Sequence, residues 1–107
     1  MDGFWTVQFS GVQGFGFGVV TLIRGHVFGG DGNFIYTGTY TDQGGTLNAR
    51  IHVRRGAPGV QSVMGIDQFV LILTGSLLGN TLTAKGNIPG SNLQLQARLT
   101  KQSELPR

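Results

Sequence analysis

The sequence predicts an all-β fold, and within that class a small eight-stranded antiparallel up-and-down β-barrel. Apolar and polar residues alternate with a period of two along most of the chain, and Gly, Asn and Asp mark turns roughly every 8–12 residues. No segment combines helical periodicity with helix caps. Closure into a barrel removes the strand edges that so apolar a chain would otherwise expose, so we favour a barrel over a sandwich.

Length and composition allow one domain and exclude several classes of protein. The chain has 107 residues, of which 39% are hydrophobic and 12% charged, and it contains 19 Gly, 3 Pro and no Cys. The hydrophobic content argues against disorder, and the absence of cysteine excludes disulfides, thiolate metal sites and cysteine nucleophiles. We expect one barrel domain over residues 1–102 and a flexible C-terminal tail over residues 103–107.

The clearest strands lie in the C-terminal half. Over residues 47–54, Leu47, Ala49, Ile51 and Val53 alternate with polar residues, which is typical of a strand buried on one face. Residues 80–86 and 92–100 repeat this alternation. Residues 69–77 are apolar on both faces, which indicates that the outer face of this strand is also covered.

Four further strands are expected in the N-terminal half, over residues 3–10, 14–23, 26–29 and 33–41. Glycines occupy alternate positions from Gly14 to Gly18, which allows a strand to bend sharply where a small sheet closes on itself. We expect Phe15 and Phe17, which lie between these glycines, to fill the core. The other aromatic side chains are expected in the barrel interior or in a dimer interface.

Short turns are predicted at residues 24–25, 30–33, 42–45, 79–80 and 89–90, where Gly, Asn, Asp and Pro gather. Between residues 56 and 66 the alternation lapses, and this segment is the longest connection. Its role as a lid, an interface or a plain loop is left open.

The sequence contains no catalytic or metal-binding constellation. His26 and His52 are its only histidines, and His52 lies between Arg50 and Arg54, two cations that oppose a bound metal. No G-x-S-x-G motif is present, and four of the five acidic residues stand at turns or chain ends, where Asp caps the backbone. We therefore expect no metal, no cofactor and no enzymatic activity.

The inward faces of the predicted strands supply a candidate interior for a small apolar ligand. Eight strands enclose room for their own side chains or for one small ligand, and the many large inward residues of this chain favour a packed interior. The candidate interior residues are Trp5, Val7, Phe9, Tyr36, Tyr40, Ile51, Val53, Leu71, Leu95 and Leu99.

A positive charge raises a nucleic-acid hypothesis. The sequence contains eight Lys and Arg residues and five Asp and Glu residues, which gives a formal net charge of +3. The expected basic outer face consists of Arg50, His52, Arg54 and Arg55. That strand carries no aromatic side chain on which a base could stack, and the remaining basic residues are scattered, so we do not expect a nucleic-acid partner.

Several short motifs follow one another along residues 2–101. They are Asp2-Gly3 before an aromatic residue, Gly16-Phe17-Gly18, Gly29-Gly30-Asp31, Tyr36-Thr37-Gly38, Ile51-His52-Val53, Pro58 with Ser62-Val63, and an alternating Leu-rich hairpin at the end. In the order and spacing of these motifs the chain resembles the GrlR-like family of bacterial proteins.

The resemblance implies a lipocalin-like eight-stranded barrel that forms a homodimer and has no enzymatic activity. The family's known regulator represses type III secretion genes by sequestering a transcription activator, which it holds with four acidic residues between its fourth and fifth strands. The matching stretch here is Asp42-Gln43-Gly44-Gly45, in which only Asp42 is acidic. This loop lacks the charge that would attract a basic DNA-binding protein.

The sequence thus leaves two main hypotheses. The first is a non-enzymatic, homodimeric regulator that binds a protein partner such as a transcription regulator. The alternative is a carrier of a small apolar ligand in the barrel interior. The N-terminus has no basic segment followed by an apolar one, and the longest apolar run, residues 69–73, is too short to span a bilayer. We therefore expect a cytoplasmic location without membrane association.

Overall fold

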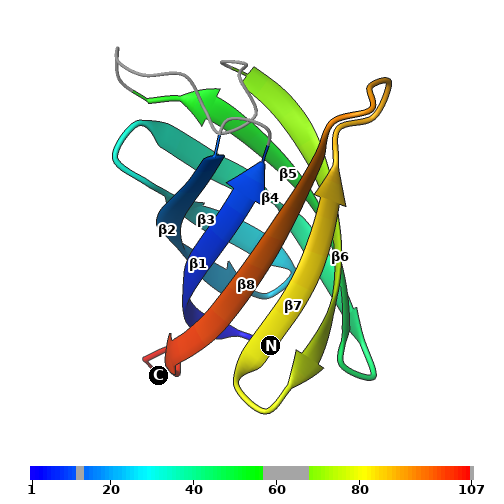
Figure 1. Ribbon diagram of the computed structural model, residues 1–107. Coiled ribbons are helices and arrows are strands. Elements are labelled where there is room, and N and C mark those ends of the chain that lie inside the picture. The colour runs from blue at the N-terminus through cyan, green and yellow to red at the C-terminus, as the bar shows by residue number, and fades with distance from the viewer. Residues whose placement is uncertain (12–13, 57–67, 107) are drawn as a thin grey trace.

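The chain forms eight antiparallel strands that close into a barrel (Figure 1). The computed structural model describes residues 1–11, 14–56 and 68–106. Each strand pairs with its neighbours in the sequence, and β1 pairs with β8 to complete the barrel. The predicted all-β, eight-stranded antiparallel barrel is therefore confirmed. The strands are β1 (Gly3–Gly11), β2 (Gly14–Ile23), β3 (His26–Gly30), β4 (Phe34–Gln43), β5 (Thr46–Arg55), β6 (Gln68–Leu78), β7 (Thr81–Asn87) and β8 (Gln94–Ser103).

Two-residue turns set the register of the hairpins at one end of the barrel. Arg24 and Gly25, between β2 and β3, both have positive φ angles, of 50° and 80°. Gly44 and Gly45, between β4 and β5, also have positive φ angles, of 62° and 87°. Turns of this kind match the twist of the two strands they join, and glycine adopts their backbone conformation without strain.

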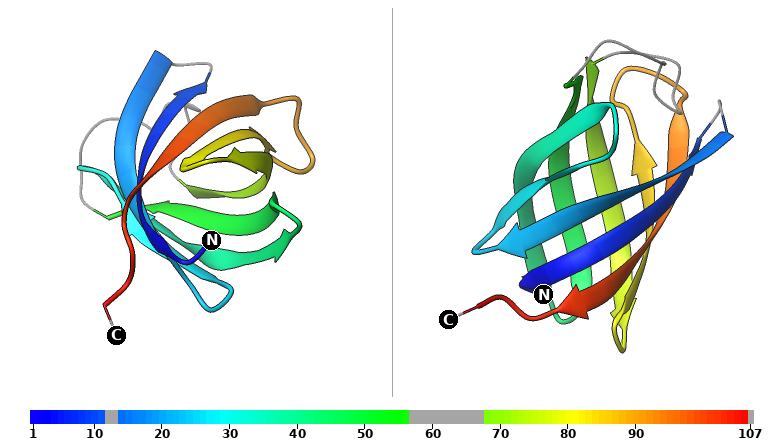
Figure 2. Two further views of the ribbon diagram at one scale, coloured as in Figure 1. Left: turned by 90° about the horizontal axis from the view of Figure 1, so that it is seen from below. Right: turned by 90° about the vertical axis from the view of Figure 1, so that its left-hand side faces the viewer.

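The two ends of the barrel differ in what they carry. Both termini and the turns at residues 24–25, 44–45 and 79–80 lie at one end, which we call the terminal end (Figure 2). The turn at residues 31–33, between β3 and β4, lies at the other end, which we call the Asp31 end. Among the described residues, none forms a helix that is long and apolar enough to cross a membrane.

Alternating side chains build one core inside the barrel. On β5, Leu47, Ala49, Ile51 and Val53 are buried, whereas the residues between them are exposed or half-buried. The strands β7 and β8 follow the same alternation. Trp5, Leu47, Leu82 and Val27 are the largest side chains that are almost fully buried. These inward faces agree with the sequence prediction because each of these strands has one apolar and one polar face.

The prediction for the faces of β2 is wrong. Phe15 and Phe17 point out of the barrel, with 87% and 58% of their surface exposed. Val20 and Leu22 are buried instead, and Val20 pairs with the buried Trp5 across β1. Because side chains alternate along a strand, burial of Val20 and Leu22 forces the two phenylalanines onto the outer face. The alternate glycines then face inward.

Most strands begin and end within one or two residues of the predicted bounds, and the largest difference is in the last strand. The last strand was expected over residues 92–100, but β8 runs from Gln94 to Ser103. It extends further because Phe4 of β1 pairs with Ser103, across an irregularity in the register between Phe4 and Trp5. The predicted long connection over residues 56–66 lies outside the described residues except for Gly56.

Candidate ligand-binding site

The interior of the barrel is not filled by its own side chains. It contains a cavity that extends to the surface beside Phe15 and Phe17, with a total volume of about 760 Å³, within the range of about 300–1,000 Å³ that is usual for small-molecule sites. Strands β1–β6 and β8 contribute to its walls. The apolar lining residues are Val7, Phe9, Phe15, Phe17, Val20, Leu22, Val27, Phe34, Leu47, Ala49, Ile51, Val53, Phe69, Leu71, Leu73, Leu95, Ala97 and Leu99.

Small inward residues leave this space open. Ala49 on β5 and Ala97 on β8 both line the cavity, and each stands at a position where a larger side chain would reach into it. Gly16 on β2 also lines the cavity and pairs with Phe9, which in turn pairs with Ala97. A stretch of the wall across β2, β1 and β8 therefore has Phe9 as its one large side chain.

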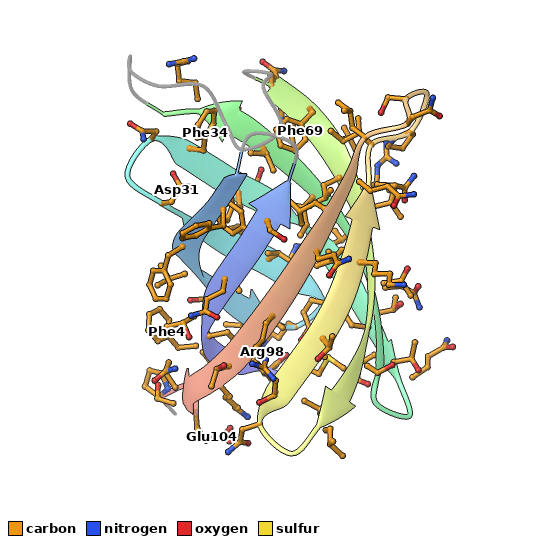
Figure 3. The ribbon with its side chains drawn as sticks, viewed as in Figure 1. Phe4, Asp31, Phe34, Phe69, Arg98 and Glu104 are labelled. Atoms are coloured by element: carbon orange, nitrogen blue, oxygen red, sulfur yellow. The ribbon has the colours of Figure 1, made fainter. Side chains whose placement is uncertain are left out.

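Polar groups gather at the Asp31 end of the cavity. Asp31, Asn33 and Tyr36 line it there, and Figure 3 shows Asp31 at the same end as Phe34 and Phe69. Asp31 Oδ1 accepts hydrogen bonds from the backbone N–H groups of Asn33, at 2.8 Å, and Phe34, at 2.9 Å. Asp31 Oδ2 accepts one from the Tyr36 hydroxyl. Burial raises the pKa of Tyr36, and this hydrogen bond raises it further.

The cavity reaches the surface beside β2. Residues 14–18 of β2 pair with β1, but the pairing between β2 and β3 begins only at Val19, which lies opposite Gly30. Phe15, Gly16 and Phe17 line the cavity on one side of this gap, and residues 31–33 line it on the other. The two phenylalanines are largely exposed, so the cavity is open to solvent between these two segments. We call residues 15–17 and 31–33 together the side opening.

The geometry of Tyr36 depends on a glycine at this opening. A Cβ atom on Gly18 would lie 2.9 Å from Tyr36 Oη and 2.9 Å from the carbonyl oxygen of Gly30. The ring of Phe9 meets the ring of Tyr36 edge-on, with 6.4 Å between the ring centres. The absence of a side chain at Gly18 therefore leaves the room in which the Tyr36 hydroxyl reaches Asp31.

The terminal end of the barrel is closed by a second group of side chains. Trp5 is 1% exposed, and its indole N–H donates a hydrogen bond of 3.1 Å to the carbonyl oxygen of Met1. The Tyr40 hydroxyl donates to Asp2, which also accepts from the backbone N–H of Arg24. The hydrogen bond from Tyr40 lowers the pKa of Asp2. Burial, followed by the bond to Asp2, raises the pKa of Tyr40 to about 12.

Most of the predicted interior residues line the cavity. Trp5 and Tyr40 are buried but belong to the closed terminal end, so they do not line it. The predicted residues that do line it are Val7, Phe9, Tyr36, Ile51, Val53, Leu71, Leu95 and Leu99.

Sequence reasoning missed three kinds of lining residue, one of which is Gly16, Val20 and Leu22 of β2, whose inward face was predicted wrongly. Leu47, Ala49, Leu73 and Ala97 belong to the inward faces that the alternation already marks, so the same pattern could have identified them. The turn residues, above all Asp31, carry no such signal, because an Asp within a Gly-rich turn indicates a turn and nothing about a cavity.

The basic outer face of β5 contains three of the four predicted residues. Arg50 and Arg54 are exposed on the outer face of β5, with the half-buried His52 between them. Arg55 does not share that face. It follows the inward-facing Val53 by two positions, and its guanidinium lies 5.7 Å from the centre of the Phe34 ring. The strand's alternation places Arg55 on the inward side at the Asp31 end.

The stretch Asp42-Gln43-Gly44-Gly45 forms the end of β4 and its turn into β5. Asp42 Oδ1 accepts a hydrogen bond from the Gly45 N–H, at 3.2 Å. Asp42 Oδ2 lies 3.4 Å from the N-terminal ammonium group of Met1. The one acidic side chain of this stretch therefore already interacts within the chain.

The described part of the chain holds no group of three or more His, Asp or Glu side chains that could bind a metal ion. No protein-family model matches the chain, and neither does any curated protein. The resemblance to the GrlR-like family accordingly stays a prediction. The described residues form a cavity that can surround a mostly apolar molecule whose polar end lies near Asp31.

Proposed function

We propose that this protein binds one small apolar molecule inside its barrel, as a carrier or a sensor of that molecule. The observation that supports the proposal is the cavity of about 760 Å³ with its walls of aliphatic and aromatic side chains. Moving the apolar surface of a ligand from water into such walls contributes about 25 cal/mol for each Å² buried. Of the two hypotheses from the sequence, the ligand carrier gains the stronger support.

A fluorescence titration tests this function. N-phenyl-1-naphthylamine is a neutral probe that emits strongly in apolar surroundings, and we expect it to bind with a stoichiometry of one. Ala97→Phe places a ring in the cavity and should reduce binding about tenfold or more, because it removes the space for the probe. Gln96→Phe adds the same ring at the neighbouring outward position and should leave binding unchanged.

Circular dichroism of the two variants separates loss of binding from loss of folding. Folded Ala97→Phe protein that binds the probe as well as the natural protein does would contradict the proposal. Equal losses in both variants would also contradict it, because the probe would then bind outside the barrel.

A second candidate function is protein binding through the outer face of β1–β3, first of all between two copies of this chain. None of the outward residues of these strands is a Lys, Arg, Asp or Glu. Phe4 and Phe28 flank Thr21 on this face, because Phe4 pairs with Thr21 and Thr21 with Phe28. Uncharged surfaces with exposed aromatic side chains are typical of protein interfaces.

Sedimentation equilibrium tests this second candidate. We expect a dimer of the 11.4 kDa chain and expect Phe17→Ser with Phe28→Ser to shift it towards the monomer. Leu78→Ser removes a similarly exposed apolar side chain beside the turn between β6 and β7, and it should leave the dimer intact. A monomeric natural protein at micromolar concentration would exclude the dimer.

A further inference from the structure

Among the described residues, the polar side chains that line the cavity lie at one end, and they include the Asp31 carboxylate. Asp31, Asn33 and Tyr36 lie at the Asp31 end, whereas the lining deeper in the barrel, such as Leu22 and Leu47, is aliphatic. A molecule that fills this cavity buries an apolar part among the aliphatic side chains. Any polar group it has must face the side opening, because a buried polar group without a hydrogen-bond partner is costly.

The Asp31 carboxylate keeps one acceptor position for a ligand. An ionised carboxylate offers about four acceptor positions, and Asp31 uses three of them for the N–H groups of Asn33 and Phe34 and for the Tyr36 hydroxyl. The Tyr36 hydroxyl donates its proton to Asp31, so it presents only its lone pairs to the cavity. Both groups therefore accept hydrogen bonds from a ligand, and neither has a proton to donate.

Among the described residues, no cationic side chain lines the cavity beside Asp31. The lining contains Asp31 but no Lys, Arg or His. Arg55 lies nearby, with its guanidinium over the Phe34 ring, but it does not line the cavity. An anionic head group at the side opening would meet the Asp31 carboxylate and the lone pairs of the Tyr36 hydroxyl, which is a repulsive arrangement; the Asn33 side-chain amide, which can donate as well as accept, suits a head group of either kind.

Resting on the proposed function, we infer that the ligand is an amphiphile with an apolar chain and an uncharged or cationic head group that donates hydrogen bonds. A long-chain alcohol or amine has this chemistry, and its O–H or N–H donates to Asp31. A long-chain carboxylate lacks it. The barrel thus selects its ligand by the charge and donor capacity of the head group as well as by the apolar chain.

Competition between three ligands of equal chain length tests the inference. Dodecan-1-ol, dodecylamine and dodecanoate are added below their micelle concentrations to the protein saturated with N-phenyl-1-naphthylamine. We expect the alcohol and the amine to displace the probe at concentrations about tenfold or more below that of dodecanoate. Displacement by dodecanoate at the same or a lower concentration would overturn the inference while leaving the proposed function intact. Failure of the probe itself to bind would instead overturn the proposed function.

Two substitutions assign the selection to the side opening. Asp31→Asn keeps an acceptor oxygen for the turn but removes the charge, and it should bring the affinities for dodecanoate and dodecylamine closer together. Asn33→Lys places a cation at the same opening without removing the backbone N–H that Asp31 binds, and it should make dodecanoate the better ligand. The two variants change different residues, so unchanged selectivity in a folded Asn33→Lys protein would overturn the inference even if Asp31→Asn fails to fold.

Discussion

The hydroxyl of Tyr36 donates a hydrogen bond to Asp31, and the same carboxylate holds the turn between β3 and β4 through two backbone N–H groups. Tyr40, four residues further along β4, makes the equivalent bond to Asp2 at the terminal end. One strand thus ties both ends of the barrel with a tyrosine–aspartate pair. The pair at the Asp31 end lines the cavity, and the pair at the terminal end belongs to the closed end.

Tyr36→Phe should destabilise the fold while leaving its topology unchanged. The substitution removes a half-buried hydrogen bond to a carboxylate, and bonds of that kind contribute about 1.5–3 kcal/mol. Urea unfolding followed by circular dichroism measures the change in the free energy of unfolding. A loss below about 0.5 kcal/mol would show that solvent replaces the bond at no cost.

Tyr40→Phe should change the stability at alkaline pH. The pKa of Tyr40 rises in the folded state from 10.0 to about 12, so the folded protein holds this proton more tightly than the unfolded chain does. The resulting stabilisation is complete below pH 10 and is lost as the pH rises through about 12. The variant has no hydroxyl at this position, so its free energy of unfolding should fall less steeply over this interval. Equal slopes for the two proteins would contradict the assignment.

Gly38→Ala should destabilise the barrel, whereas Gly32→Ala should not. A Cβ atom on Gly38 would lie 2.0 Å from the carbonyl oxygen of Arg50 on the paired strand, and that backbone cannot move without disturbing β5. A Cβ atom on Gly32 meets nothing within 4 Å. We expect a loss of about 1–3 kcal/mol for Gly38→Ala and a change within about 0.5 kcal/mol for Gly32→Ala. Thermal unfolding of both variants measures the difference, and equal stabilities would refute the close approach of β4 and β5.

Trp5→Ala should have the largest effect on stability of these substitutions. The indole ring is 1% exposed at the closed terminal end, with the ammonium group of Lys101 at 6.0 Å from the ring. Truncation of a buried tryptophan costs about 3–5 kcal/mol. The neighbouring Phe4→Ala, on the outer face, should cost much less because Phe4 is already partly exposed. Chemical unfolding followed by circular dichroism compares the two, and a similar loss in both would contradict the inward position of Trp5.

The sequence predicts strand faces well where only one face is apolar. Leu47 to Val53 alternate with polar residues, so their inward face follows directly from the period. The same reasoning fails on β2, where glycines alternate with phenylalanines at one end and apolar residues stand on both faces at the other. There the inward face is decided by pairing, because Val20 lies opposite Trp5, and pairing is not visible in a single strand's sequence.

The candidate site divides in the same way. Its aliphatic walls follow from alternation, which places Ile51, Val53 and Leu71 on inward faces. The volume of the cavity does not follow from alternation. It depends on how far the strands are staggered around the barrel, and therefore on which inward residues face one another. The bond between Tyr36 and Asp31 was also not predicted, because Asp31 reads as a residue that caps its own turn.

A methyl NMR titration with N-phenyl-1-naphthylamine tests the central claim, that the barrel interior binds an apolar molecule. The methyl groups of Ile51, Val53 and Leu71 line the cavity, whereas those of Ile72 and Leu78 belong to outward-facing residues of β6. We expect the lining methyl resonances to shift and to saturate at one equivalent of probe while the outward resonances stay in place. Shifts confined to the outward methyl groups, or none at all, would contradict the claim.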